Sequence, residues 1–218
     1  GSGLVGSEMC IRDRVYRDGG IGMSKEENVV KYYAICNRLK NVIRKGWKLW
    51  NVQRDRLESV AEHIFSTQML AIAMKHEYQY DVDIMKVVFM LAIHELGEAI
   101  IDDLTQFEIK KSDKEKIEHA AVHEILSGIL DGKQIEELFL EFDSHSTKEA
   151  FFAYQCDKLE CDLQSKIYDE EGCVDLTKQD GNFVMNNSIV KRLLDNGESW
   201  STMWLKYGQE MYPYDDLS

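Results

Sequence analysis

A histidine and several carboxylates directly follow the most apolar segment of this chain. The segment MKVVFMLAI runs into HELGEAIIDDL, which carries His94, Glu95, Glu98, Asp102 and Asp103. Charged side chains seldom end so apolar a helix unless they are paired or bound to a metal. The stretch therefore predicts a metal site or, in so acidic a protein, a solvated helix end.

Two further polar residues interrupt other apolar helical segments. His63 and Asp157 each have an ordinary explanation, as a hydrogen-bonded core histidine and as an aspartate paired with a neighbouring lysine such as Lys158. Together with His94 and Glu95, they supply two imidazoles and two carboxylates from three predicted helices. This donor set suits a borderline or hard divalent ion that keeps positions open for water and substrate.

The spacing within HELGE supports a shared ion. Successive residues of an α-helix are about 100° apart, so His94 and Glu95 can both reach one ion over the helix edge. Glu98 is one turn further on and can support the ion's water. This geometry assumes that residues 82–100 form one continuous helix.

Composition favours a single all-α domain. Proline occurs once, at Pro213, and the apolar content of 44% is ordinary for a globular chain of 218 residues. A net charge of −13 disfavours nucleic acid and anionic membranes as partners. No apolar run approaches the ~20 residues of a membrane span. Five cysteines without a framework spacing indicate free thiols in a reducing cytoplasm.

Helical periodicity begins after residue 23. Residues 1–22 lack an amphipathic period and are interpreted as a non-native leader or tag, which leaves 23–218 as one domain. Capping boxes are expected at Ser24–Glu27 and Ser146–Glu149. Helices are expected from Ser24 to Ile43 and over 59–78, 82–100, 114–130, 134–145, 146–172 and 186–207. In the second of these, Val60, Ile64, Met69, Leu70 and Ala73 are expected on the buried face.

The order of short motifs carries a resemblance. RKGW (44–47), ESVAEH (58–63), HELGE with DD behind it (94–103) and CDKLE (156–160) follow one another in the chain. In this order they resemble the HD-domain metal-dependent phosphohydrolases, and within them the 5′-deoxynucleotidase-like group. The resemblance covers residues 39–168.

The resemblance implies a compact, single-domain HD-type helical bundle that forms a homodimer. It implies a divalent metal ion (Mn, Co, Mg, Fe or Zn) held by His63, His94, Glu95 and Asp157. Glu98 matches the catalytic glutamate that orients or deprotonates the attacking water, and Asp103 an acidic residue near the leaving oxygen. Arg44 matches a phosphate-binding arginine, with Trp47 near the sugar, although Trp47 could equally be a plug between helices.

One position departs from the family pattern. The histidine–aspartate pair that names the family is His94–Glu95 here. Glutamate still offers a hard oxygen ligand, but its side chain is one methylene longer. It could bind the ion bidentately, or it could weaken the site enough that the domain binds without turnover.

The predicted function is hydrolysis of the 5′-phosphate of deoxyribo- or ribonucleoside monophosphates by a metal-bound water, in the cytoplasm. A triphosphohydrolase or cyclic-nucleotide phosphodiesterase would need a more basic pocket lining or a GYP-type motif. A nucleotide or metal sensor is the alternative, and the presence of Glu98 and Asp103 favours the enzyme. A third alternative, a helical interaction protein with coincidental motifs, predicts that no metal is bound.

A second pair of histidines is interpreted as part of a helix surface rather than as a metal site. His119 and His123 are four residues apart, a spacing that permits a further metal site. The segment around them is amphipathic, so both are expected at its polar edge, and short matches of this kind are unreliable.

Overall fold

The computed structural model describes residues 23–105 and 108–211, and the predicted leader, 1–22, lies outside them. The helices are α2 (Lys25–Cys36), α3 (Lys45–Leu49), α4 (Val60–Tyr78), α5 (Ile84–Ile93), α6 (Glu98–Ile101), α7 (Lys111–Leu126), α8 (Gly132–Ser144), α9 (Lys148–Glu170), α10 (Ser188–Asp195) and α11 (Trp200–Met211). Short 3₁₀ helices are η1 (Asn37–Lys40), η2 (Leu176–Lys178) and η3 (Phe183–Asn186). The described residues contain no named strand, only an isolated bridge between Ile43 and Ser59. The all-α prediction is confirmed.

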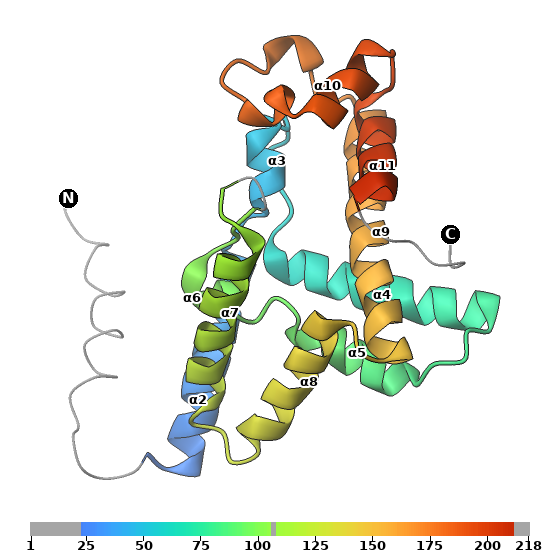
Figure 1. Ribbon diagram of the computed structural model, residues 1–218. Coiled ribbons are helices and arrows are strands. Elements are labelled where there is room, and N and C mark those ends of the chain that lie inside the picture. Colours follow the sequence, from blue (N-terminus) through green and yellow to red (C-terminus); the bar gives the residue numbers. More distant parts are fainter. Residues whose placement is uncertain (1–22, 106–107, 212–218) are drawn as a thin grey trace, which may run out of the picture.

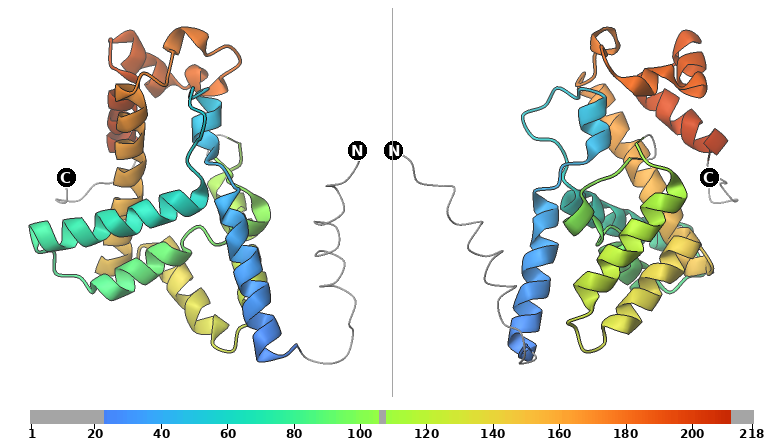
Figure 2. Two further views of the ribbon diagram at one scale, coloured as in Figure 1. Left: turned by 180° about the vertical axis from the view of Figure 1, so that it is seen from behind. Right: turned by 60° about the vertical axis from the view of Figure 1, so that its left-hand side comes forward.

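Two long helices, α4 and α9, cross near the middle of the molecule (Figure 1). The apolar helix α5 packs against both, and α8 lies between α5, α7 and α9. Helix α2 runs beside α7, and α11 lies along the second half of α9 (Figures 1 and 2). No helix of the described residues is long and apolar enough to cross a membrane.

Helix α4 begins where the sequence indicated. Ser59 is the N-cap, and the capping box with Glu62 satisfies two backbone donors that a helix start leaves unpaired. The predicted buried face is partly wrong, because the fully buried positions include His63, Thr67 and Ala71, whereas Met69 is 44% exposed. Apolar residues lie all round α4, so periodicity could not single out the face that α5 and α9 cover.

The predicted continuous helix over 82–100 is wrong. Helix α5 ends at Ile93, and residues 94–97 form turns before α6 starts at Glu98. Their hydrogen bonds span three residues, with Leu96 N donating to Ile93 O at 2.9 Å and Glu98 N to Glu95 O at 3.1 Å. Such winding advances about 120° per residue, so the separation of about 100° expected for His94 and Glu95 does not apply.

Other helix boundaries also differ from those predicted from the sequence. The capping box at Ser24 is present, but the start of α9 is capped by Thr147, whose side chain accepts a hydrogen bond from Ala150 N. The predicted tail helix 186–207 is two helices, separated at Gly197, which has a φ of +84°. Positive φ ends a helix at glycine with little strain. The described cysteines are free thiols, as expected.

Three apolar clusters form the interior. We call them the aromatic cluster (Trp47, Trp50, Tyr168, Trp200, Met203, Tyr207 and neighbours), the α7 cluster (Leu39, Val60, Ile93, Leu96, Val122, Leu126, Phe139 and neighbours) and the α5 cluster (Ala71, Val87, Met90, Leu91, Phe142, Phe152, Cys156 and neighbours). The polar residues of the predicted site lie on segments that join these clusters. His63 lies between Val60 and Ala71 on α4, and Asp157 lies between Cys156 and Tyr168 on α9.

A glycine at the start of α8 provides a test of this packing. A Cβ on Gly132 would overlap the backbone carbonyl of Leu126, whereas a Cβ on Gly46 would meet nothing within 4 Å. We expect Gly132→Ala to lower the free energy of unfolding by roughly 2–3 kcal/mol, because the α7–α8 turn must shift. Gly46→Ala, the control, should leave stability unchanged or slightly raised. Urea unfolding of both variants measures this, and equal midpoints would contradict it.

Candidate metal centre

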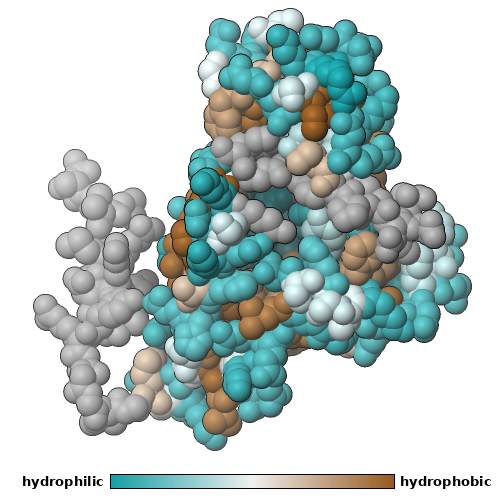
Figure 3. Space-filling model, viewed as in Figure 1, coloured by the Kyte–Doolittle hydropathy of each residue, from teal (hydrophilic) through white to brown (hydrophobic). Residues whose placement is uncertain are grey.

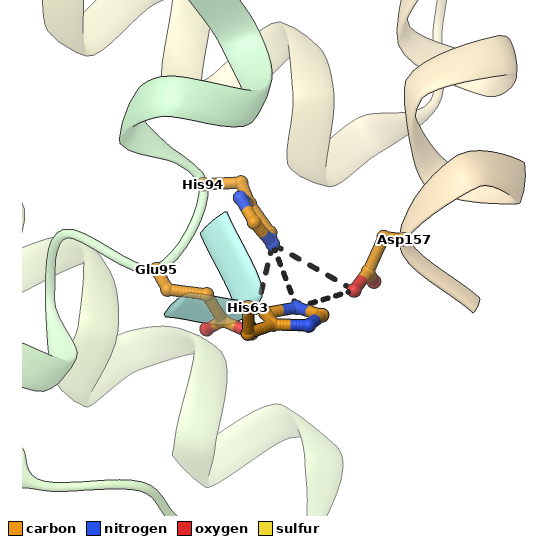
Figure 4. Close-up of side chains that lie close together, drawn as sticks. All are labelled: His63, His94, Glu95 and Asp157. Atoms are coloured by element: carbon orange, nitrogen blue, oxygen red, sulfur yellow. Dashed lines mark hydrogen bonds and ion pairs between the residues drawn. The ribbon is translucent and has the colours of Figure 1, made fainter. Parts of the chain in front are cut away.

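The predicted ligands converge where α4, the end of α5 and α9 meet. His63, His94, Glu95 and Asp157 each offer a ligand atom, and these atoms all lie within 4.8 Å of one another. His94 Nε2 is 3.4 Å from His63 Nε2, 3.6 Å from Asp157 Oδ1 and 3.8 Å from Glu95 Oε1 (Figure 4). His63 is fully buried, and His94 and Asp157 are nearly so.

Hydrogen bonds on the far side of each ring fix which nitrogen faces the cluster. His94 Nδ1 lies 2.8 Å from the carbonyl oxygen of Leu91, which can only accept, so Nδ1 carries the hydrogen. His63 Nδ1 lies 2.5 Å from Glu160 Oε2, and a carboxylate likewise accepts. Both Nε2 atoms therefore face the same space, where each offers a lone pair to a metal ion once it carries no proton, as metal-ligating histidines do.

The donor set fits a cation. Burial and the charge of Arg44 would lower the pKa of His63, but hydrogen bonds with Asp157 and Glu160 outweigh them and raise it to about 9. Two facing imidazole nitrogens and two carboxylates leave an excess of negative charge that a proton or a divalent ion must balance. Two nitrogens and two oxygens suit a divalent ion of the borderline or hard kind.

The two carboxylates of the set are restrained by cations outside it. Asp157 Oδ2 lies 2.9 Å from Lys158 Nζ, and Glu95 Oε1 lies 3.3 Å from Arg44 Nη1. Burial would raise the pKa of Asp157, but Lys158 and the histidines hold it well below its ordinary value. In the same way His94, Lys114 and Arg44 overcome burial and lower the pKa of Glu95 to about 2. Both groups are therefore anionic at neutral pH.

The carboxylate of Glu98 has fewer stabilising contacts than the other acidic side chains of the region. It is fully buried, and neither of its carboxylate oxygens has a hydrogen-bond partner. Burial raises its pKa well above the ordinary value, and the nearby charges of Glu95 and Asp103 raise it further. Its nearest cation is Lys114, whose Nζ lies 3.7 Å from Oε1.

Arg44, Trp47 and Asp103 meet around the short helix α3. The backbone of Arg44 donates to Glu58 O at 3.0 Å, and its side chain donates to Cys161 Sγ at 3.0 Å. Asp103 Oδ2 accepts from the backbone N of Lys45 at 2.5 Å. Asp103 therefore ties the segment after α6 to the start of α3.

Trp47 has a clear packing role. Its Nε1 donates to Glu58 Oε2 at 2.9 Å, and its ring packs edge-on against Tyr168 and Trp200. Burial and the proximity of Glu160 raise the pKa of Glu58 to about 7. The indole thus joins the aromatic cluster to the buried carboxylates.

One cavity connects these groups. Its volume is about 740 Å³, and its wall includes Arg44, Trp47, His94, Glu95, Glu98, Asp103, Lys114 and Asp157. The molecular surface is hollowed between α3 and α11 (Figure 3). A cavity of this size accepts a nucleotide-sized ligand.

A model of the HD domain matches residues 36–197 of the chain. The chain belongs to the HD-domain family. Among curated proteins it is 32% identical to 5′-deoxynucleotidase HDDC2 of Dictyostelium discoideum, over 66% of this chain and 79% of that protein. It is 29% identical to 5′-deoxynucleotidase HDDC2 of Homo sapiens, over 66% of this chain and 69% of that protein.

Solved structures agree on the fold of this HD domain. A conserved hypothetical protein of Pyrococcus furiosus superposes with a TM-score of 0.58 and 25% identity, over 81% of this chain and 99% of that one. A predicted metal-dependent phosphohydrolase of Magnetospirillum magnetotacticum gives a TM-score of 0.56 and 20% identity, over 86% and 94%. The resemblance seen in the motifs is therefore confirmed at the level of family and fold.

Sequence reasoning missed several polar residues of the centre. Glu160 contacts His63 and lies three residues after Asp157 in CDKLE, a spacing that places both on one face of α9. That spacing was the available signal. Lys114 and Cys161 gave none, because their approach to the site depends on how α7 and α9 pack.

The second histidine pair, His119 and His123, lies at the polar edge of its helix, as expected. His119 Nε2 is 2.8 Å from Asp143 Oδ2, and His123 Nδ1 is 3.1 Å from Glu136 Oε1, so both pair α7 with α8. Neither histidine belongs to the candidate metal groups found among the described residues.

The contact between Glu160 and His63 leads to a prediction about metal affinity. We expect Glu160→Gln to weaken divalent-ion binding by roughly 10- to 100-fold, because the amide no longer fixes the tautomer and orientation of His63 as firmly. Calorimetric titration of metal-stripped protein with Mn²⁺ or Co²⁺ measures this. Glu170→Gln, at an exposed position of the same helix, is the control and should bind as the wild type. Equal affinity of both variants would show that Glu160 does not support the site.

Proposed function

We propose that this HD domain is a metal-dependent phosphohydrolase that removes the 5′-phosphate of nucleoside monophosphates, with a preference for deoxyribonucleotides. The observation that carries the proposal is a largely buried set of two imidazoles and two carboxylates beside Glu98, a carboxylate without hydrogen bonds, on one cavity wall. The 5′-deoxynucleotidase name of the curated relatives supports the substrate class.

In this proposal His63, His94, Glu95 and Asp157 hold the divalent ion. When bound, such an ion neutralises charge on phosphoryl oxygens and lowers the pKa of a coordinated water. The residues around the set provide the rest of the chemistry. Their positions on the cavity wall support the role proposed for each of them below.

Glu98 is proposed as the group that receives the proton of the attacking water. Its free oxygens can accept that hydrogen bond, and burial raises its pKa, which makes its carboxylate a stronger base. Asp103 is proposed to face the leaving 5′-oxygen. Its hydrogen bond from Lys45 N holds one carboxylate oxygen and leaves the other for the substrate.

Arg44 is proposed to bind the phosphate. Its Nη1 lies at an ion-pair distance of 3.3 Å from Glu95, and the guanidinium has further N–H groups that can form paired hydrogen bonds to phosphate oxygens. Trp47 lies on the cavity wall and is proposed to contact the sugar with the part of its ring that does not pack in the aromatic cluster.

Phosphate release from a panel of deoxy- and ribonucleoside 5′-monophosphates tests the proposal. We expect metal-stripped protein to be inactive and to regain turnover with Mn²⁺, Co²⁺ or Mg²⁺. Glu98→Gln should lower kcat by roughly 10²- to 10⁴-fold, the usual contribution of a general base. Glu124→Gln, at an exposed position of α7, is the control.

The same assay tests Glu95, the residue that departs from the family pattern. If Glu95→Asp raises kcat, the longer native side chain reduces turnover. Metal binding without turnover on any nucleotide would replace the enzyme with a nucleotide or metal sensor. Absence of stoichiometric metal would refute the ligand set itself.

We further propose a cytoplasmic homodimer that binds no nucleic acid. The outer face of α4 carries Phe65, Met69 and Ile72, one stripe of exposed apolar side chains. Light scattering should give about twice the chain mass of 25.3 kDa. Phe65→Glu should give a single chain, whereas Leu130→Glu, at an exposed apolar position away from α4, should remain dimeric. A monomeric wild type would exclude the dimer.

A further inference from the structure

Glu98 poses an electrostatic problem that the proposed ligands do not solve. A buried carboxylate without hydrogen bonds is strongly destabilised in its charged form unless a cation lies nearby. Glu95 and Asp103 face it with further negative charge. The proposed role of Glu98 requires its ionised form with the oxygens correctly aimed, and a nearby cation would support both.

Arg44 is occupied elsewhere. Its Nη1 contacts Glu95 Oε1 at 3.3 Å, and its Nη2 donates to Cys161 Sγ at 3.0 Å. Its charge favours the ionised form of Glu98, as that of Lys114 does, but burial and the neighbouring acids outweigh both and keep the pKa of Glu98 raised. The cation that forms an ion pair with Glu98 therefore comes from another residue.

Lys114 is that cation. Its Nζ lies 3.7 Å from Glu98 Oε1, and also 3.6 Å from Glu118 Oε1 one turn further along α7. The first distance is an ion pair rather than a hydrogen bond. Burial alone would lower the pKa of Lys114, but Glu95, Glu118 and Glu98 overcome it and raise the pKa, so the ammonium is charged at neutral pH.

The backbone brings α7 close enough for this contact. Gly97 lies in the turn before α6, and a Cβ on it would be 3.3 Å from the carbonyl oxygen and 3.4 Å from the Cα of Glu118. This turn and α7 thus approach backbone to backbone, which only a residue without a side chain allows comfortably. Because Lys114 and Glu118 lie one turn apart, the same approach aims Lys114 at Glu98.

We propose that Lys114 is a positioning residue, whose ammonium group holds the carboxylate of Glu98 in its working place while Glu118 holds the ammonium group. The inference rests on the proposed function, in which Glu98 receives a proton from water. Lys114 acts through Glu98 and does not contact the reacting atoms. A direct contact with the phosphate is the competing role, because Lys114 also lines the cavity.

Steady-state kinetics separates these roles. The variants are Lys114→Met, Lys114→Arg and the double variant Lys114→Met with Glu98→Gln, assayed with the best deoxynucleoside monophosphate and Mn²⁺. Lys116→Met is the matched control, at an exposed position of the same helix. We expect Lys114→Met to lower kcat by roughly 30- to 100-fold with KM changed less than about twofold, as for a small misplacement of a catalytic group.

Two further kcat comparisons complete the kinetic test: rescue by Lys114→Arg, and the effect of Lys114→Met in the Glu98→Gln background. Lys114→Arg should recover kcat to within about fivefold of the wild type, since it restores the charge. In the Glu98→Gln background, Lys114→Met should cost less than about twofold, because the group it positions is gone. A rise in KM at unchanged kcat would overturn the proposal in favour of phosphate binding. Equal losses in both backgrounds, or no loss, would overturn it outright.

A thermal measurement tests the contact without turnover. Lys114→Met should lower the unfolding midpoint of metal-free protein, and Glu98→Gln should restore most of that loss, because the buried charge disappears. Additive shifts of the midpoint would overturn the contact. Coupled shifts in an inactive wild type would retain the contact but overturn both the positioning role and the proposed function.

Discussion

The architecture of this HD domain depends on placing many carboxylates together in a region with little access to water. Four of these carboxylates have a cationic or proton-bearing partner: Glu95 lies beside Arg44, Glu98 beside Lys114, Asp157 beside Lys158 and Glu160 beside His63. Without these partners the desolvation penalty of such a cluster would exceed what packing can offset. The remaining negative charge lies where the Nε2 atoms of His63 and His94 face each other, which is the place proposed for the divalent ion.

The extra methylene of Glu95 matters within this balance. A single oxygen, Oε1, lies 3.3 Å from Arg44 Nη1 and 3.8 Å from His94 Nε2. It therefore contacts a metal donor and the arginine proposed to bind phosphate at once. A shorter aspartate would reach one of them less easily, so glutamate would couple the proposed metal ligands to the proposed phosphate-binding arginine. Release of Arg44 toward a phosphate would leave Glu95 free to turn fully toward the ion.

Much of this site could be predicted from sequence because polar residues in apolar helices are conspicuous. His63, Asp157 and the HELGE segment stood out for that reason, and their order along the chain matched one family. The capping box at Ser24 was equally legible, since capping uses local hydrogen bonds, and the helix start near Ser59 was predicted without its capping box. The start of α9 was displaced by one residue because Ser146 and Thr147 offer the same hydroxyl.

The features that could not be predicted from sequence depend on contacts between distant segments. At the turn of residues 94–97, which replaces a continuous helix, Gly97 lies against the backbone of α7, and no local pattern encodes that approach. Lys114 is an ordinary surface-type residue by sequence, yet the same approach leaves only 25% of its side chain exposed. The buried face of α4 was ambiguous because two other helices cover different sides of it. Tertiary packing decided each of these features.

The placement of the metal donors also links the interior clusters. His63 lies on the segment of α4 that joins the α7 cluster to the α5 cluster, and Asp157 lies on the segment of α9 that joins the α5 cluster to the aromatic cluster. The donors are far apart in sequence, so the unfolded chain contains no preformed site and the free energy of ion binding adds to that of folding. An ion held at this junction would fasten all three clusters together. The same rigidity keeps Glu98 and Arg44 at fixed positions on the cavity wall, so the arrangement that stabilises the fold also orients the proposed chemistry.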